Sequence, residues 1–198
     1  MKIVLASGNK NKFYEIKEVL EKIQAELLFG GDFPNYSEVQ ETEDSYYGNA
    51  LLKARSWARV TGLPAMADDS GIEVSALDGA PGIHSARIVP GSDEDRVEWL
   101  LNSLKDKEDR SAKFVCCIVV FFPETERIIV SEKSCTGLIT SFSKGSAGFG
   151  YDPIFMPTGY DKTFAELGDE VKRKISHRAL AIKDIAERLI PVIQYDTV

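Results

Sequence analysis

Apolar residues are arranged in two ways along the chain: as short continuous runs, and as single residues three or four positions apart. The runs at 2–6 and 25–30 predict buried strands. After the first run, apolar residues recur at Phe13, Ile16 and Leu20, which predicts an amphipathic helix. The chain is therefore expected to begin with a strand, a polar loop, a helix and a second strand.

The same two patterns predict further elements. They are helices at about 45–61 and 92–104, strands at about 112–122 and 127–139, and a last helix that begins near Ser176. Residues 123–126 suit a hairpin between the two strands. Because every residue from Phe114 to Phe122 is apolar, we expect this strand to be buried on both faces, with helices packed on either side of the sheet.

An apolar segment, Leu63–Ala67, leads directly into two neighbouring carboxylates, Asp68 and Asp69. In a strand, successive side chains point to opposite faces, so only one of the pair could face a given cleft. A carboxylate at the end of such a strand is a candidate ligand for Mg²⁺, which takes few carboxylates and keeps water and phosphate oxygens as its other ligands. The alternative is a tight turn, for which Asp, Ser and Gly are ordinary residues.

The first strand is followed by a polar loop that could bind an anion. It consists of Ser7, Gly8, Asn9, Lys10, Asn11 and Lys12. The free N–H groups and the positive dipole end of the following helix would point at this loop, and its two lysines add positive charge. The loop lacks the Walker A pattern, so a helix simply capped by Ser7 or Asn9, with solvated lysines, is the alternative.

Two features in the C-terminal part suggest contact with a flat, polar ligand. Residues 143–155 form a glycine-dense loop in which Phe149 or Tyr151 could stack on a ring, unless these aromatic side chains are tucked into the core. His177 and Arg178 lie in the first turn of the last predicted helix. Positive charge there opposes the helix dipole, which indicates that an anion or a polar ring is bound nearby.

Composition limits the class of protein. With 198 residues, of which 43% are hydrophobic and 28% charged, the chain is expected to fold as one globular domain, residues 1–198. Its net charge of −7 argues against binding to nucleic acid phosphates. Three cysteines make neither a disulfide framework nor a metal site. The sequence has no secretion signal and no apolar run long enough to span a membrane, which predicts a cytoplasmic protein without a membrane partner.

Four sequence blocks occur in an order that is highly specific. They are Ser7-Gly8-Asn9 with Lys12, Ala67-Asp68-Asp69-Ser70-Gly71 continuing to Pro81-Gly82 and Ser85-Ala86-Arg87, Gly148-Phe149-Gly150-Tyr151-Asp152-Pro153, and Ser176-His177-Arg178. A fifth and softer block is Asn49-Ala50-x-x-Lys53-Ala54. Through these blocks the chain resembles, over nearly its whole length, the inosine triphosphate pyrophosphatases, which act on non-canonical purine nucleoside triphosphates.

The resemblance implies an α/β fold with an elongated mixed β-sheet flanked by helices, in two lobes with a central cleft. It also implies a Mg²⁺-dependent enzyme that hydrolyses the triphosphates of inosine, deoxyinosine and xanthosine (ITP, dITP and XTP) to the monophosphate and pyrophosphate. Such an enzyme keeps deaminated purines out of nucleic acid. Members of the family are typically homodimers, so a second copy is the expected protein partner.

The resemblance also implies roles for residues of this chain. Asp69 would be the catalytic acid-base and, together with Glu41, a ligand of Mg²⁺. The substrate would be bound at Ser7, Gly8, Asn9, Lys10, Asn11, Lys12 and Ser70. The base and sugar pocket would be lined by Phe149, Gly150, Tyr151 and Asp152, with Lys172, His177 and Arg178 meeting the base or the phosphate side.

Charge neutralisation and positioning dominate the hydrolysis of phosphoanhydrides, so we expect Lys12 and Lys53 to offset the charge that develops on the phosphates. Two alternatives remain. A Maf-type pyrimidine nucleotide pyrophosphatase is disfavoured by the Ser176-His177-Arg178 block. A nucleotide sensor that has lost catalysis is disfavoured by the joint presence of Lys12, Glu41 and Asp69.

Overall fold

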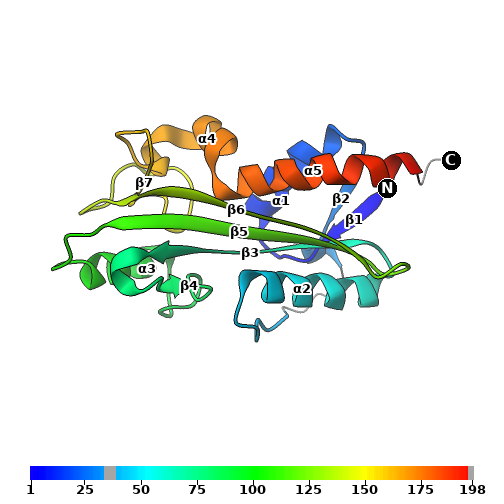
Figure 1. Cartoon of the computed structure of the whole chain (residues 1–198), viewed down its shortest axis with the longest axis horizontal. Coiled ribbons are helices and arrows are strands. Elements are labelled where there is room, and N and C mark those ends of the chain that lie inside the picture. Colours follow the sequence, from blue (N-terminus) through cyan, green and yellow to red (C-terminus); the bar gives the residue numbers. More distant parts are fainter. Residues whose placement is uncertain (34–38, 196–198) are drawn as a thin grey trace. The chain divides into compact units, whose positions relative to one another are not determined.

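Helices and strands alternate along most of the chain, as the sequence predicts. The computed structural model describes residues 1–33 and 39–195. In chain order its elements, with 3-10 helices marked η, are β1 (Lys2–Leu5), α1 (Lys10–Glu21), β2 (Glu26–Phe29), η1 (Gly30–Asp32), α2 (Tyr46–Thr61), β3 (Ala65–Val74), η2 (Ser75–Leu77), β4 (Pro81–Gly82), α3 (Asp93–Ser103), β5 (Ser111–Phe122), β6 (Arg127–Ile139), β7 (Phe155–Pro157), α4 (Phe164–Ile175) and α5 (His177–Tyr195) (Figure 1).

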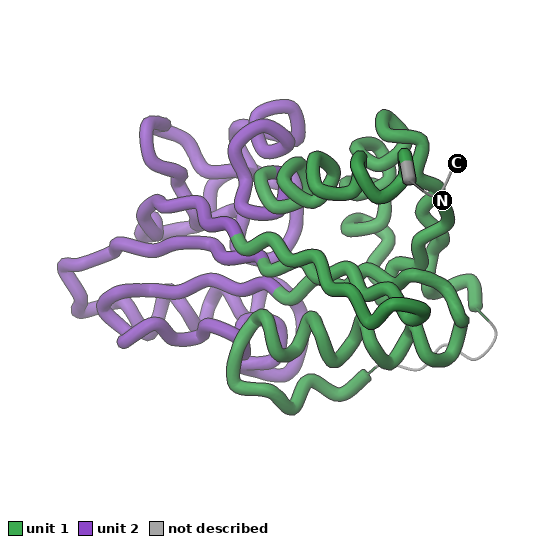
Figure 2. The backbone as a smooth tube through the Cα atoms, turned by 45° about the vertical axis from the view of Figure 1, so that its right-hand side comes forward, with its two compact units in different colours: residues 1–69, 117–132, 180–198 green, residues 70–116, 133–179 purple. Residues whose placement is uncertain are grey.

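The chain divides into two compact units (Figure 2). Unit 1 comprises residues 1–69, 117–132 and 180–198, and unit 2 comprises residues 70–116 and 133–179. The boundaries fall inside the strands β3, β5 and β6 and inside helix α5 rather than in loops. That the whole chain behaves as one domain stays a prediction.

The strands form a mixed sheet. In unit 1, β1 is parallel both to β2, with Lys2 opposite Glu26, and to β3, with Val4 opposite Ala65. In unit 2, β4 is antiparallel to β3 and β7 is antiparallel to β6. The strand order is β2-β1-β3-β5-β6-β7, with β4 beside β3. The predicted α/β class with a mixed sheet and flanking helices is confirmed.

Local sequence explains where the helices of unit 1 begin and end. The side chain of Asn9 accepts hydrogen bonds from two backbone N–H groups at the start of α1. Ser45 caps α2 in the same way, and Gly62 ends it in the left-handed conformation at φ 67°. α2 and α5 lie on opposite sides of the unit 1 strands (Figure 1). Within unit 1 this arrangement covers residues 117–122 of β5. Every residue from Phe114 to Phe122 is buried, as predicted.

The core of unit 2 lies on one face of its part of the sheet. Alternate strand residues such as Ile72, Phe114 and Phe155 pack there with Leu100 of α3 and Phe164 of α4. The intervening strand residues point to the other face, because side chains alternate along a strand. That second face carries the groove described below.

Several elements differ from those expected. β3 does not end at Asp68 and Asp69 but continues to Val74, so the carboxylates lie in the middle of a ten-residue strand. The prediction of a strand end, like the alternative of a tight turn, was therefore wrong. Helix α4 and the short strands β4 and β7 were not predicted. The polar, acid-rich sequence of residues 32–43 predicts a loop, and residues 34–38 of it lie outside the described residues.

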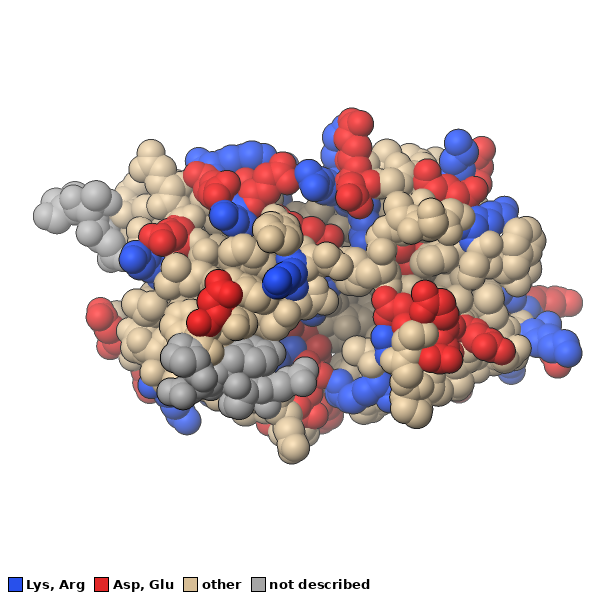
Figure 3. Space-filling view, turned by 180° about the vertical axis from the view of Figure 1, so that it is seen from behind, with Lys and Arg blue, Asp and Glu red and all other residues tan. Residues whose placement is uncertain are grey.

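Surface charge is mixed in sign. On the face drawn in Figure 3, acidic and basic side chains are interspersed. Among the described helices, none combines the length and the apolarity that crossing a bilayer requires. Any attraction for a charged ligand must therefore be sought in local groups of side chains.

Candidate active site

Unit 1 contains a group of charged side chains around β3, which we call the acidic cluster: Lys12, Glu41, Lys53, Asp68 and Asp69. The alternation of the strand sends its two aspartates to different partners. Asp68 Oδ2 lies 2.9 Å from Lys12 Nζ, which comes from α1. Asp69 instead faces α2, where its Oδ1 lies 3.6 Å from Lys53 Nζ. The predicted division of the pair is thus present.

Lys53 lies between the two carboxylates expected to bind Mg²⁺. Its Nζ is 2.5 Å from Glu41 Oε1 and 3.6 Å from Asp69 Oδ1. The side chains of Lys53, Glu41 and Asp69 are only 13%, 22% and 7% exposed. Glu41 and Asp69 therefore converge on one position, and a positive group occupies it.

The electrostatics of the cluster are perturbed in a consistent way. Burial raises the pKa of Asp69 to about 6, with Glu41 and Asp68 adding to the rise and Lys53 opposing it. Burial by itself lowers the pKa of Lys53, but the carboxylates of Asp68, Asp69 and Glu41 outweigh it and raise that pKa. A partly buried carboxyl group with a pKa near neutrality is a candidate for proton transfer.

The charge balance bears on metal binding. Three carboxylates, of Glu41, Asp68 and Asp69, stand against the two ammonium groups of Lys12 and Lys53, which leaves one negative charge in excess. Within residues 1–33 and 39–195, no three His, Cys, Asp or Glu side chains are grouped so that they could hold a metal ion. Two converging carboxylates fit Mg²⁺ if phosphate and water supply the remaining ligands, which is how Mg²⁺ is often bound.

Asn49 orients Asp69, a role that sequence analysis did not assign. Its side chain is fully buried. Its Nδ2 donates a hydrogen bond to Asp69 Oδ2 over 3.1 Å, and its Oδ1 accepts one from the N–H of Glu43 over 3.0 Å. One amide thus ties the aspartate to the segment that carries Glu41. The block Asn49-Ala50-x-x-Lys53-Ala54 was the only signal for it.

The predicted phosphate loop is an ordered helix start. Asn9 Oδ1 accepts hydrogen bonds from the N–H groups of Asn11 and Lys12, at 2.9 and 3.2 Å, and Ser7 Oγ accepts one from the N–H of Asn9 at 3.1 Å. Gly8, Lys10 and Asn11 are exposed. The alternative of a capped helix is therefore present, and phosphate binding by the same residues stays a prediction.

Unit 2 contains a second group, which we call the aromatic cluster: Phe149, Asp152, Lys172 and Arg178. Lys172 Nζ lies 2.5 Å from Asp152 Oδ2 and 4.3 Å from the centre of the Phe149 ring. The Arg178 guanidinium lies 5.4 Å from the same ring centre. Asp152, Lys172 and Arg178 are each at most 6% exposed. Two cations thus lie close to one aromatic ring, which favours contact with electron-rich groups.

Neighbouring residues hold this cluster in place. Arg178 Nη2 donates a hydrogen bond to Ser70 Oγ over 3.1 Å. The hydroxyl of Tyr151 donates one to the carbonyl oxygen of Ser85 over 2.9 Å. The ring of His177 stacks on Phe114, with centroids 4.7 Å apart and planes at 11°. Of the predicted residues, unit 2 therefore brings together Ser70, Phe149, Asp152, Lys172 and Arg178. Tyr151 is instead buried in the core of unit 2, as the alternative for this aromatic residue had it.

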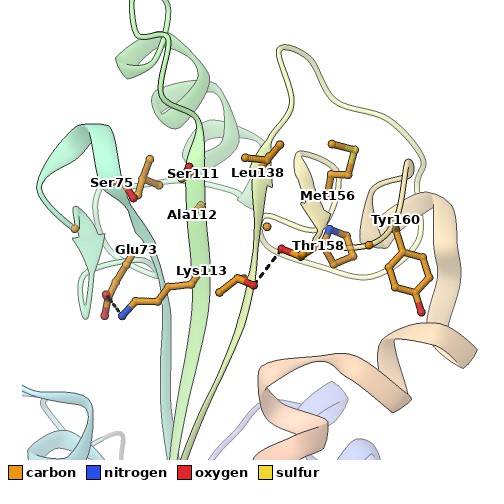
Figure 4. A pocket seen from close by; sticks show the side chains of 15 residues that line it. Glu73, Ser75, Ser111, Ala112, Lys113, Leu138, Met156, Thr158 and Tyr160 are labelled. Atoms are coloured by element: carbon orange, nitrogen blue, oxygen red, sulfur yellow. Dashed lines mark hydrogen bonds and ion pairs between the residues drawn. The ribbon is translucent and has the colours of Figure 1, made fainter.

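A groove of about 710 Å³ lies on the second face of unit 2 (Figure 4). Lys113 and Glu73, on the neighbouring strands β5 and β3, point toward each other along its lining, with Nζ and Oε2 2.9 Å apart. Thr136 and Thr158 share a hydrogen bond of 3.1 Å beside them. None of the predicted site residues lines this groove. The acidic cluster of unit 1 and the aromatic cluster of unit 2 therefore remain the candidate functional groups.

Comparison with known proteins agrees with the fold. The HAM1 protein of Coxiella burnetii superposes with a TM-score of 0.90 at 36% sequence identity, over 96% of this chain and 99% of that one. The Ham1 protein of Staphylococcus aureus superposes with a TM-score of 0.88 at 38% identity, over 97% and 100%. The fold is thus that of the Ham1 proteins of known structure.

The sequence relationship is equally extensive. The model of the Ham1 family matches residues 3–188, and the chain belongs to that family. The dITP/XTP pyrophosphatase of Desulforamulus reducens is 44% identical over 193 residues, 96% of each chain. That of Treponema denticola is 43% identical over 191 residues, 94% of this chain and 97% of the relative.

Proposed function

We propose that this protein is a nucleoside triphosphate pyrophosphatase that hydrolyses ITP, dITP and XTP to the monophosphate and pyrophosphate. Family membership and relatives named dITP/XTP pyrophosphatase support the assignment. The observation that carries it at the level of side chains is Asp69, a partly buried carboxyl group with a pKa near 6, held between Asn49 and Lys53. The comparisons give no support to the pyrimidine-specific alternative.

Unit 1 is assigned the triphosphate. Lys10 and Lys12, with the helix start at Ser7–Lys12, would bind the phosphates. The acidic cluster carries an excess negative charge, so a bare polyphosphate would be repelled, whereas a complex of nucleotide and Mg²⁺ would not. Glu41 and Asp69 would hold the ion, which when bound supplies charge neutralisation on the phosphate oxygens.

The chemical step needs an activated water and a leaving pyrophosphate. In our proposal Asp69 takes a proton from the water. The water oxygen bonds to the α-phosphorus, while the bond from this phosphorus to the oxygen shared with the β-phosphate breaks and pyrophosphate leaves. Asn49 donates a hydrogen bond to Oδ2 of this carboxylate, and Oδ1 lies 3.6 Å from Lys53 Nζ. Lys53 and Lys12 offset the negative charge that develops on the phosphates.

Unit 2 is assigned the base. Phe149 would stack on the purine, and Lys172, His177 and Arg178 would supply donors to its 6-oxo group. Adenine carries an amino group at that position, so it would leave a buried donor unmatched, at a cost of about 1–3 kcal/mol. The chain joins the two assignments directly, because Asp69 of unit 1 is followed by Ser70 of unit 2.

Release of pyrophosphate from ITP, dITP, XTP, ATP and a pyrimidine triphosphate, each with and without Mg²⁺, tests the assignment. We expect turnover of the first three that requires Mg²⁺, and kcat/KM for ATP lower by about tenfold or more. Equal kcat/KM for ITP and ATP would remove His177 and Arg178 as readers of the base. No release from any nucleotide would favour the non-catalytic sensor, and preference for the pyrimidine would favour the Maf-type alternative.

We further propose that the protein acts as a homodimer in the cytoplasm, where its substrates arise, without nucleic acid or membrane partners. Typical family behaviour supports the dimer. Light scattering at micromolar concentration tests it, and a mass of one chain would contradict it.

A further inference from the structure

One contact links the glycine-dense loop to a helix that sequence analysis gave no part in the site. The carboxylate Oδ2 of Asp93 accepts a hydrogen bond of 2.6 Å from the N–H of Gly150, 57 positions further along the chain. Asp93 is the first residue of α3, and both residues belong to unit 2. Gly150 is flanked by Phe149 and Tyr151, the two aromatic residues predicted to meet the base.

Asp93 is not needed to cap its own helix. Ser92 and Asp95 form a capping box, in which the Ser92 side chain accepts from the N–H of Asp95 and the Asp95 side chain accepts from the N–H of Ser92. Asp93 Oδ1 is instead held by Arg96 Nη2 at 2.5 Å. With one oxygen fixed by the arginine, the other is directed at the loop.

The loop around Gly150 depends on such ties. Gly148 and Gly150 have φ of 81° and 62°, a region that only glycine enters readily. A side chain at Gly148 would lie 2.1 Å from Asp152 Oδ2, which accepts a 3.0 Å hydrogen bond from the N–H of Phe149. The peptide before Phe149 is therefore fixed by Asp152, and the peptide after it by Asp93.

We propose that Asp93 is a positioning residue for the nucleotide base: by holding the Gly150 peptide against α3, it sets the plane of the Phe149 ring beside Lys172 and Arg178. The inference rests on the proposed function, in which Phe149 stacks on the purine. The pKa of Asp93 is lowered, chiefly because hydrogen bonds from Arg96 and Gly150 outweigh its partial burial. The carboxylate is thus charged at neutral pH, which strengthens its bond to the Gly150 N–H.

The test compares Asp93→Ala with Glu94→Ala. Glu94 carries the same charge in the same first turn, but its side chain is exposed and bonds to Ser92. Any general effect on the helix dipole should appear in both variants, and an effect on the loop only in the first. Asp93→Asn keeps an oxygen for the Gly150 N–H and should retain most of the wild-type behaviour.

Two measurements are made on each variant. Hydrogen exchange of the peptide covering residues 143–155, without nucleotide, reports the tie itself. Equilibrium binding of IMP reports base positioning without requiring catalysis. For Asp93→Ala we expect faster exchange and a Kd for IMP raised about three- to tenfold, a modest change because the Asp93 side chain is 41% exposed. On substrate, KM should rise while kcat stays within about twofold.

The outcomes separate the inference from the proposed function. Faster exchange with unchanged IMP binding would overturn the positioning role, as would equal effects of Asp93→Ala and Glu94→Ala. If the wild type binds IMP but releases no pyrophosphate, the proposed function fails while weaker binding by Asp93→Ala still supports the inference. If the wild type does not bind IMP, both the inference and the proposed function are wrong. If Asp93→Ala does not fold, Arg96→Gln replaces it, because this change frees Oδ1 of Asp93. The variant should show the same changes to a smaller extent. Wild-type hydrogen exchange and wild-type IMP binding in this variant would overturn the inference.

Discussion

The acidic cluster of unit 1 and the aromatic cluster of unit 2 hold buried charge in opposite ways. In unit 1, three carboxylates share two ammonium groups, and the pKa of Asp69 is raised to about 6. In unit 2, the carboxylate of Asp152 lies 2.5 Å from Lys172, and both Lys172 and Arg178 lie beside the Phe149 ring. The first group therefore has one negative charge in excess, and the second has one positive charge in excess.

In the proposed function, this difference in charge separates the chemical step from recognition of the base. Excess negative charge in a partly buried place is costly and persists where a cation or a proton must be handled. In the aromatic cluster the Asp152–Lys172 pair leaves the Arg178 cation in excess beside Phe149, where it can contact an electron-rich base. Changes in the acidic cluster should therefore alter kcat, and changes in the aromatic cluster should alter binding, selectivity and stability.

The largest effect is expected at Asp69. Asp69→Asn should lower kcat by about 10³-fold or more, because the amide cannot accept the proton of the water. Steady-state pyrophosphate release measures it, with circular dichroism to show that the variant is folded and IMP binding to show that the base is still recognised. Asp68→Asn is the matched control on the other face of β3, and its kcat should fall much less. Turnover near the wild-type value would remove Asp69 from the mechanism.

Next comes Lys172 in the aromatic cluster. Lys172→Met leaves the Asp152 carboxylate buried without its cation, so the free energy of unfolding should fall by about 3–5 kcal/mol. Urea denaturation measures it. The double variant Lys172→Met with Asp152→Asn removes the stranded charge and should recover part of the loss. If the double variant is no more stable than the single one, the ion pair does not carry the stability of this loop.

A smaller loss is expected when the link between Asp69 and Glu43 is removed. Asn49→Ala deprives Asp69 Oδ2 of its donor and should lower kcat by about tenfold to a hundredfold, with little change in IMP binding. Asn49→Asp keeps an acceptor for the N–H of Glu43 but faces Asp69 with a second carboxylate, so its kcat should be no higher than that of Asn49→Ala. Recovery of kcat in Asn49→Asp would show that the Glu43 end alone matters.

The smallest effect is on stability. Although Asp69→Asn should lower kcat, it should raise the free energy of unfolding. A raised pKa means that the folded protein binds the proton of Asp69 more tightly than the unfolded chain does, so stability is lost as the pH rises from about 4 to 6. Asparagine does not titrate and so avoids this loss. The free energy of unfolding of the variant should exceed that of the wild type by about 1–3 kcal/mol at pH 7 and by little at pH 4.

Asp93 provides the contrast to that pH dependence. Its pKa is lowered, so its carboxylate adds stability above the pKa of the unfolded chain and loses it in acid. Asp93→Asn should therefore be less stable than the wild type at neutral pH, and the difference should shrink only as the pH falls below about 4. Urea denaturation at several pH values measures both variants. Parallel curves for the two variants would show that the pKa values of Asp69 and Asp93 are not shifted in opposite directions.

Continuous or periodic apolar patterns predicted most of the fold. β5 is evident from its unbroken apolar run, and α2 from its stripe between Ser45 and Gly62. Helix α4 was missed although Thr163 and Glu166 form a capping box that is visible in the sequence. Gly168, at φ 73°, interrupts this helix with non-helical geometry. That interruption breaks the regular spacing on which helix prediction depends.

The candidate site was predictable as a set of residues but not as a set of contacts. The sequence pattern indicated Asp68 and Asp69 as site residues, but it predicted that the strand ends at them. β3 continues past them and pairs with β4 at Ile72 and Glu73, while α1 and α2 supply Lys12 and Asn49 to the carboxylates. Partners 20 to 60 residues away leave no trace in a local pattern, which is also why Asp93 was assigned only to a helix start.

The division of β3, β5 and β6 between the two units has a consequence for synthesis and for recombination. Unit 1 needs three separate stretches of chain, the last beginning at Leu180, and unit 2 needs two. During translation, the segment bearing Asp69 must therefore wait for α5 to emerge before its unit can be completed. A single crossover between relatives cannot exchange one unit intact, so the two units should be inherited together.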